Sequence, residues 1–484
     1  MSFTNQSGLL SPFMEVVPEA AKVGGLTKSS LLTQRRRCRI VPQTGPSATP
    51  SSQVQLLVSD AGGLLDPRSM VLNYTMTVAG TASVCPDDGH PFGAVQVLLN
   101  GSLLDNIQNA MKVTNIESTL GSSKSYYQTA GSFQGCELLN EDLQSAALGT
   151  TGLTDTTVAS FGRVVNNVTS IDARYKRAAL PFNNNTTGTQ RSIPIGNMTG
   201  FGRCKTYLPI AILGEVSLVL QTGSNADVLF QFSSTQDATY TLSNISLEYD
   251  IVVPDARYAA LLQKVAGEDA GMTIPYESTI VATGGVISAS AASLQESVVI
   301  TSRATNHLLR ASVVQIPQAA ISLLSYPSQS CFSHAGLFST QFRVGSLTFP
   351  QIAAQGDAAL FNMSLAAYGS PTQENGGVTN RLLWANSTNP TTAGTASCYE
   401  DAVSTSGSAR FAYADRCVPS FGFATCKGGA EPLDVDGISL AGASGSQLIT
   451  SLISAPLAAY IPYVSMVALR FIRAAGGTAQ VVGA

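Results

Sequence analysis

The chain has 484 residues and a formal net charge of −4, and charged residues make up 12 % of it, about half of the roughly 25 % usual in soluble domains. Hydrophobic residues make up 44 %, so the chain is not of the disordered class, which combines low hydrophobicity with high net charge. The 27 basic and 31 acidic residues give no broad field that would attract nucleic acid or an anionic membrane.

The shortage of charge needs an explanation, because a solitary soluble protein normally covers its surface with charged side chains. Interface cores between subunits are depleted of Lys, Glu and Asp, so a chain mostly covered by copies of itself can do without them. A secreted β protein rich in Ser and Thr is the alternative. Composition alone does not decide between the two.

The lack of a recognisable signal peptide and the spacing of the cysteines favour a chain that is not exported. The first 25 residues lack the basic start and apolar block of a signal peptide. The longest uncharged stretch, 437–469, contains two prolines, so we expect no transmembrane helix. The eight cysteines are scattered without a Cys-x-x-Cys pair, which favours free buried thiols. A bridge within Cys398, Cys417 and Cys426 is the alternative.

In the first half, short runs of alternating apolar and polar residues predict strands with one buried face. After Asn100-Gly101, a dipeptide that favours a tight turn, we expect a short helix with Leu103, Leu104, Ile107 and Met111 on one face. Pro254 ends the clearest strand, and Asp255 can cap a second helix. The runs lie at 54–58, 72–78, 95–99, 216–220, 228–232 and 245–253.

In the second half, the strand pattern begins again after a Gly/Ser/Ala-rich connection at 282–293. It resumes at Val298 and ends with a closing strand near 463–471, with one helix expected at 357–368. Both halves thus share strands, one helix inside a long excursion, and a closing strand, which suggests a structural duplication. Long polar loops are expected at 114–198 and 369–430.

No residue set typical of a catalytic centre is present. Phosphate-binding and dinucleotide-binding glycine patterns are missing, and the stretch at 442–445 lacks the spacing of a nucleophile elbow. The only histidines are His90, His307 and His334, too few for imidazole chemistry. We therefore expect no enzymatic activity and no cofactor. A β-sandwich hydrolase with scattered carboxylates is a third hypothesis.

Two polar clusters have ligand-type residues. Cys331 and His334 have the spacing of half a zinc site, but no second donor pair is evident, so a turn beside a buried thiol is preferred. The cluster at 85–90 also holds Pro86 and Gly89, which favour a solvated turn over a metal site. Its ligand-type residues are Cys85, Asp87, Asp88 and His90.

One basic run precedes the first predicted strand: Arg35, Arg36, Arg37 and Arg39. Clustered guanidinium groups bind phosphate, so the run could face a genome or serve nuclear import. Alternatively, it is an arm that pairs with acidic groups on a neighbouring subunit. We favour the second interpretation, because no aromatic residues are interleaved with the arginines.

Several phrases, in this order, resemble the major capsid proteins of the double jelly-roll lineage, which includes polinton-like viruses, virophages, large DNA viruses of eukaryotes and tailless phages. They cover most of the chain from residue 54 to 471. They are LLDPRSMVL at 64–72, LLNGSLL at 98–104, RSIP at 191–194, TYLP at 206–209, VSLVL at 216–220, the strand and helix at 245–258, and FRVGS at 342–346 with Phe349-Pro350.

The resemblance implies an all-β fold of two tandem antiparallel jelly rolls with a few short helices and long surface loops. We expect an N-terminal arm (1–50), a first jelly roll (51–265), a connection (266–293), a second jelly roll (294–475) and a C-terminal tail (476–484).

The function that the resemblance implies is that of a major capsid protein. It would assemble inside the infected cell as a trimeric, pseudo-hexagonal capsomer and tile an icosahedral virion shell. Its partners would be copies of itself and minor capsid and penton proteins, with contact to nucleic acid as the less favoured interpretation. The alternative is a surface or extracellular β-sandwich protein that binds carbohydrate.

Overall fold

The structure is a computed structural model. It describes residues 32–60, 62–80, 84–86, 89–122, 130–131, 134, 188–231, 237–268, 271–288, 295–300, 307–322, 324, 328–329, 332–333, 337–368, 384, 417–423, 437–439, 446–452, 459–475 and 478–482.

The first half of the chain forms two antiparallel sheets, together called the first roll. One sheet has the order β1 (Leu32–Ile40), β10 (Thr239–Pro254), β3 (Leu64–Ala79) and β7 (Thr189–Pro194). The other has the order β2 (Gln53–Val58), β8 (Val216–Thr222), β5 (Phe92–Leu99) and β6 (Ser102–Gln108). A short pair, β4 (Val84–Pro86) and β9 (Leu229–Gln231), lies beside them.

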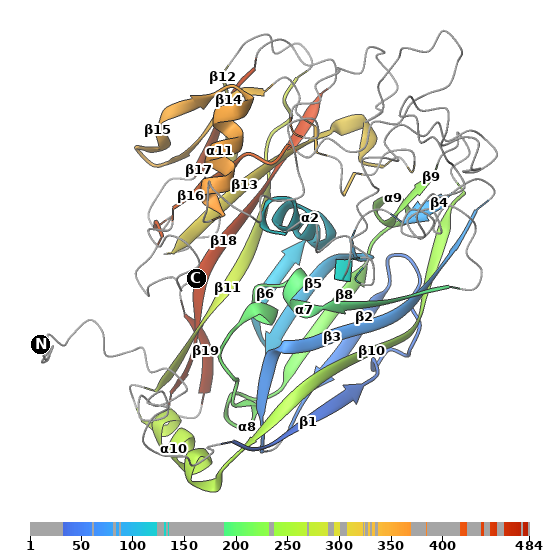
Figure 1. The fold of residues 1–484 in the computed structure, drawn as a ribbon, viewed down its shortest axis with the longest axis vertical. Coiled ribbons are helices and arrows are strands. Elements are labelled where there is room, and N and C mark those ends of the chain that lie inside the picture. Colours follow the sequence, from blue (N-terminus) through green and yellow to red (C-terminus); the bar gives the residue numbers. More distant parts are fainter. Residues whose placement is uncertain are drawn as a thin grey trace, which may run out of the picture.

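The second half forms two further antiparallel sheets, the second roll. One has the order β11 (Met272–Thr283), β18 (Tyr460–Ala475), β13 (Leu308–Pro317) and β16 (Ser420–Gly422), with β19 (Thr478–Val482) also paired to β18. The other has the order β12 (Gln295–Ile300), β17 (Ser446–Leu452), β14 (Leu337–Val344) and β15 (Leu347–Gln355). Figure 1 shows the two rolls side by side, the first mainly blue and green and the second yellow to red.

The two rolls have the same strand order. When the strands of each roll are numbered along the chain, leaving out β4, β9 and β19, both rolls read 1-8-3-6 in one sheet and 2-7-4-5 in the other. Two facing sheets with this order form a jelly roll. The predicted fold class is therefore confirmed, and the suspected duplication is visible as a repeated topology.

The alternating pattern places one face of each strand in a core. In β3, Leu72, Tyr74 and Met76 are buried, while Asn73 and Thr75 between them are half-buried. The buried residues of β3 belong to a large cluster that also takes in strands of the facing sheet. The strands predicted at 54–58, 72–78 and 245–253 are confirmed.

Within the described residues, each roll carries one long internal helix at the same place, between its fifth and sixth strands: α2 (Ala110–Gly121) lies between β6 and β7, and α11 (Asp357–Ala367) lies between β15 and β16. The connecting helix α10 (Ala256–Gly267) starts as predicted, because the Asp255 carboxylate accepts a hydrogen bond from the Arg257 N–H at 2.8 Å. Shorter helices are α7 (Ile195–Met198), η5 (Phe201–Arg203), α8 (Ile210–Leu213), α9 (Asn225–Val228) and η6 (Gln318–Ala320).

The helix expected to start at Leu103 was placed too early. Asn100 and Gly101 have φ angles of 48° and 78°, the positive values that close a two-residue hairpin. The chain therefore turns directly from β5 into the strand β6, with Leu99 opposite Ser102. The helix follows that strand, and Leu104 and Ile107 enter the core from the strand instead.

Two predicted domain boundaries are also corrected. The expected N-terminal arm (1–50) contains β1, which pairs with β10 along its length. The expected connection (266–293) contains β11, which pairs with β18 from Met272 to Thr283. In both rolls the first strand completes a sheet by pairing with the last, so it belongs to the roll.

None of the helices in the part of the chain that the structure describes has the length and apolar character needed to cross a membrane.

Candidate functional site

The predicted basic run forms the edge strand β1 of the first roll. Cys38 and Ile40 pack against the core, and because side chains alternate along a strand, Arg35, Arg37 and Arg39 lie on the outer face of the sheet. All four arginines of the run are exposed. The run is therefore part of a sheet, with a defined face, instead of an arm.

Arg35 and Arg37 form ion pairs with carboxylates on β10 and β3. Arg35 Nη2 lies 2.6 Å from Asp250 Oδ2 and 3.2 Å from Asp66 Oδ2. Arg37 Nη2 lies 2.9 Å from Glu248 Oε2, and its Nη1 lies 3.4 Å from Asp250 Oδ1. The hydrogen bond to Asp250 raises the pKa of Arg35, against a smaller effect of burial.

The remaining arginines differ in their surroundings. Arg36 pairs with Asp60, whereas Arg39 lies beside Glu248 in a surface hollow. The four arginines thus face four carboxylates, Asp60, Asp66, Glu248 and Asp250, so that the local charge is balanced. The acidic partners of Arg35, Arg36 and Arg37 belong to the same chain. That the run faces a neighbouring subunit or a genome stays a prediction.

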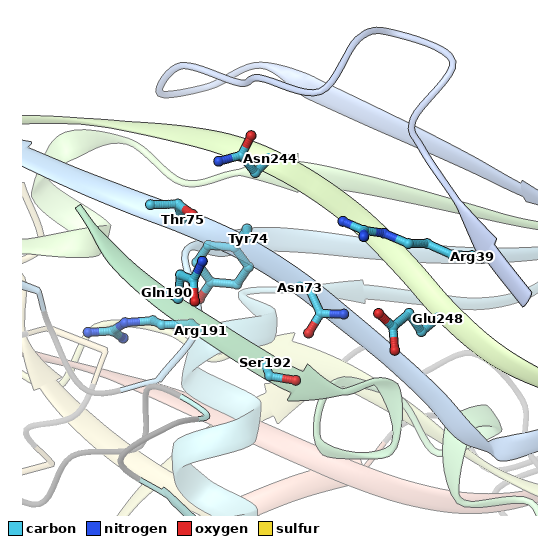
Figure 2. Close-up of a pocket in the computed structure, with 9 residues that line it drawn as sticks. All are labelled: Arg39, Asn73, Tyr74, Thr75, Gln190, Arg191, Ser192, Asn244 and Glu248. Carbon is cyan, nitrogen blue, oxygen red and sulfur yellow. The ribbon is translucent and has the colours of Figure 1, made fainter. Parts of the chain in front are cut away.

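The hollow, called here the outer trough, crosses the outer face of this sheet and has a volume of about 340 Å³. Figure 2 shows Arg39, Asn73 and Glu248 on adjacent strands and Gln190 and Ser192 along β7. Its amide, hydroxyl and charged groups can donate and accept hydrogen bonds. Its lining is Arg39, Asn73, Tyr74, Thr75, Gln190, Arg191, Ser192, Asn244 and Glu248.

A second polar region lies where the rolls meet, and is called the inter-roll contact. Helix α2 of the first roll lies against the outer face of the second roll's sheet (Figure 1). Lys112 Nζ lies 3.7 Å from the centre of the Tyr463 ring on β18, a cation–π geometry. Ile116 and Leu120 share a buried cluster with residues of β13 and β18.

An ion pair links α2 to β13. Arg310 Nη2 lies 2.5 Å from Glu117 Oε2, and both side chains are largely buried. The Arg310 guanidinium also lies 4.1 Å from the centre of the Tyr368 ring. Tyr368 in turn lies 3.2 Å, hydroxyl to hydroxyl, from Ser312. The charges of the pair compensate each other in a place where an unpaired charge would be costly.

Strand β6 packs against β11 in the same contact. The Tyr276 hydroxyl donates to the Leu104 carbonyl at 3.0 Å, and Arg470 Nη1 donates to the same carbonyl at 3.3 Å. The Ser278 hydroxyl donates to Asp105 Oδ1 at 2.5 Å. On the first-roll segment η5, Arg203 Nη2 lies 3.3 Å from Glu277 Oε2.

Asp105 is the least compensated group in the inter-roll contact. Its side chain is fully buried, and Oδ2 has no hydrogen-bond partner among the described residues. Burial raises the pKa of Asp105 from 3.8 to about 6, although the Ser278 hydrogen bond and the charges of Arg470 and Arg203 act in the opposite direction. The folded state therefore binds this proton more tightly than the unfolded chain does.

Asp105, Glu117 and Arg310 were not among the candidate residues predicted from the sequence. A signal was present for two of them: Asp105 interrupts the apolar run LLDNI, and Arg310 interrupts LLRASVV. A single charge inside a strand pattern favours a buried pair or an interface, but the pattern does not name its partner.

Of the other residues considered as possible ligands, His90 has surroundings that differ from those expected, and most of the rest lie outside the described residues. His90 is buried, contrary to the expected solvated turn, and its Nε2 lies 2.9 Å from Thr114 Oγ1. Burial lowers the pKa of His90 to about 3, so the ring is neutral. Asp87, Asp88, Cys331, His334, Cys398 and Cys426 and the side chain of Cys85 lie outside the described residues.

Within the part of the chain that the structure describes, no three His, Cys, Asp or Glu side chains form a group that could hold a metal ion. Cys38 and Cys204 are free thiols, and Cys417 is buried. Burial raises the pKa of the Cys204 thiol to about 11, so it is protonated and a poor nucleophile at neutral pH.

Comparison with known proteins places the fold. No family model and no curated protein matches the sequence. Solved structures do match. The structure of the Sputnik virophage matches with a TM-score of 0.54 and 11 % identity, over 94 % of this chain and 89 % of that one. The Faustovirus major capsid protein matches with a TM-score of 0.54 and 8 % identity, over 93 % of this chain and 92 % of that one. PBCV-1 VP54, fitted into a reconstruction of Sputnik, matches with a TM-score of 0.50 and 11 % identity over 95 % of this chain and 99 % of that one. The likeness shows a shared fold along nearly the whole chain.

We expect Asp105→Asn to stabilise the protein at neutral pH and to flatten its pH dependence. Asp105 contributes most stability below pH 3.8, and this contribution is lost as pH rises through about 6. At about 1.4 kcal/mol per pKa unit, the pH-dependent loss reaches about 3 kcal/mol at pH 7.5 and roughly half of that at pH 5. Urea unfolding of both proteins at the two pH values, at one protein concentration, measures the difference.

The matched control is Glu268→Gln, which changes an exposed carboxylate beyond the end of α10 and should keep the wild-type pH dependence. An Asp105→Asn protein with the same pH slope as the wild type would contradict the assignment.

We expect Arg310→Met alone to lower the free energy of unfolding by about 3 kcal/mol, because it leaves Glu117 largely buried without its cation. Adding Glu117→Gln should restore part of the loss, because the second change removes the uncompensated charge. Chemical unfolding of the wild type, both single variants and the double variant gives the coupling energy. Additive losses would show that the pair does not act as a unit.

Proposed function

We propose that the chain is a major capsid protein of the double jelly-roll lineage, located in the virion shell, and that its activity is self-association. The observation that carries the proposal is the repeat of one jelly roll within the chain, in an arrangement shared over more than nine tenths of its length with solved viral capsid proteins. Because fold alone does not fix function, the surface chemistry has to support the proposal separately.

The surface chemistry fits association with copies of itself. The outer trough is lined mainly by neutral amides and hydroxyls, together with the exposed Arg39, the buried Arg191 and Glu248. The neighbouring arginines are paired within the chain. A balanced charge offers little to a phosphate backbone, whose binding depends on released counterions. We therefore assign this face to protein contacts, and do not propose a nucleic-acid site there.

A more specific part of the proposal concerns how copies of the chain assemble. Three copies would present six rolls in a nearly hexagonal outline, and such capsomers would tile an icosahedral shell with minor capsid and penton proteins as further partners. Each roll, β1 to β10 and β11 to β18, would act as one domain. Low charge supports this, because surfaces buried between subunits need few charged side chains.

We expect the purified chain to form a trimer. Native mass spectrometry and light scattering at micromolar concentration should give three times the chain mass, and negative-stain images should show pseudo-hexagonal particles. A folded, monodisperse monomer at high concentration would contradict the proposal. A monomer that also bound glycans would favour the carbohydrate-binding alternative instead.

A further inference from the structure

Asp105 is a carboxylate enclosed between the two rolls. It lies on β6 of the first roll, its side chain is fully buried, and the Ser278 hydroxyl on β11 of the second roll donates to its Oδ1 at 2.5 Å. Its Oδ2 has no hydrogen-bond partner among the described residues. Buried polar atoms are nearly always hydrogen-bonded, so this oxygen marks a place where the inter-roll contact is incompletely satisfied.

The hydrogen-bond donors beside Asp105 are directed to a different acceptor. The Tyr276 hydroxyl and Arg470 Nη1 both donate to the Leu104 carbonyl, at 3.0 and 3.3 Å. One backbone carbonyl thus accepts two donors from the second roll, while Oδ2 of the next residue accepts none. This distribution of donors suits a neutral carboxyl better than an ionised one, because a buried charge needs more compensation than a buried neutral group.

The other ionisable groups around Asp105 leave its charge uncompensated. Arg203 on η5 is engaged with Glu277, at 3.3 Å from Nη2 to Oε2. Burial raises the pKa of Tyr276 and raises that of the Cys204 thiol to about 11, so both groups are neutral at pH 7. Strand β19, which also lies beside β6, has no ionisable residue in its sequence.

We propose that Asp105 makes the inter-roll contact a pH-dependent latch. When the carboxyl is protonated, no unpaired charge lies between the rolls and β6 stays against β11. When it is ionised, separation of β6 from β11 lets water reach Oδ2, so the contact opens more easily. No described strand of one roll pairs with a described strand of the other. The contact can therefore open while every sheet keeps its hydrogen bonds.

Opening is favoured at higher pH, because the closed contact binds the proton of Asp105 more tightly than the open one. Burial raises the pKa of this carboxyl from 3.8 to about 6, and exposure to water returns it toward 3.8. The stabilisation of the closed contact is complete below pH 3.8 and is lost as pH rises through about 6. By linkage, the equilibrium constant for opening should rise about tenfold between pH 5 and pH 7.5.

Cys204 can report the opening directly. It belongs to the first roll and is buried, and its thiol lies 3.6 Å from the Pro275 carbonyl oxygen on β11 of the second roll. A thiol reagent reaches it when β11 moves away. Cys38 on β1 is half-buried and lies outside this contact, so its labelling provides the internal reference.

The test is thiol labelling of the full-length chain at pH 5 and pH 7.5, with the labelled positions identified by mass spectrometry. Between these pH values, the Cys204 rate relative to Cys38 should rise about tenfold more in the wild type than in Asp105→Asn. The effect of pH on the thiols themselves cancels, because both proteins contain the same cysteines. Glu268→Gln is the control and should follow the wild type.

Ser278→Ala provides a second variant that keeps the carboxylate. The Ser278 hydrogen bond lowers the pKa of Asp105, so its removal destabilises the ionised form further. The Cys204 rate at pH 7.5 should therefore exceed that of the wild type. Circular dichroism checks that the variants fold, and Ser278→Ala tests the latch even where Asp105→Asn does not fold.

Equal pH profiles of Cys204 labelling in the wild type and Asp105→Asn would overturn the inference. Hydrogen exchange of β3, a central strand of the first roll, separates local opening from unfolding of the roll. Protection of β3 should change less with pH than Cys204 labelling does, and exchange in step with that labelling would also refute the latch. Neither outcome bears on the proposed capsid function, which is tested by the oligomeric state.

Discussion

The burial of α2 and β6 between the rolls is the constraint on which the rest of the structure depends. It brings charged groups of the first roll, among them Lys112, Asp105 and Glu117, away from water. Each needs compensation from the second roll, because a buried charge without a partner costs several kcal/mol. Tyr463 and Arg310 supply it for Lys112 and Glu117. Asp105 accepts a hydrogen bond from the Ser278 hydroxyl but has no paired cation among the described residues, and burial still leaves its pKa raised.

A repeated fold with one internal contact necessarily has unequal halves. The first roll uses its fifth strand and its helix inside the chain, and the second roll uses its outer sheet face there. The outer face of the first roll's sheet around Asn73 and Asn244, and the exposed edge of β15 at Leu347 and Ile352, lie outside this contact. The small share of charged residues, 12 %, is the composition expected of a chain that buries such surfaces against copies of itself.

Sequence reasoning predicted the strands whose side chains alternate and missed elements set by other interactions. The run at 245–253 reads directly as β10, because Ile245, Leu247, Tyr249 and Ile251 alternate along the strand and belong to one buried cluster. β1 was not found, because four arginines hide the alternation of Cys38 and Ile40, and their carboxylate partners lie on strands distant in sequence. The inter-roll ion pair joins residues 117 and 310, and no local pattern connects positions so far apart.

Two of the sheet edges, β1 and β15, differ in how they are protected against unwanted pairing. β1 is an edge strand with a line of arginines, and charged side chains on an edge oppose pairing with unrelated strands. Because Arg35 and Arg37 are paired with Asp250 and Glu248, and Arg36 with Asp60, the edge keeps this protection without a strong local field. β15 carries no charge along its length, and an uncharged apolar edge is exposed to unwanted pairing unless a specific surface covers it.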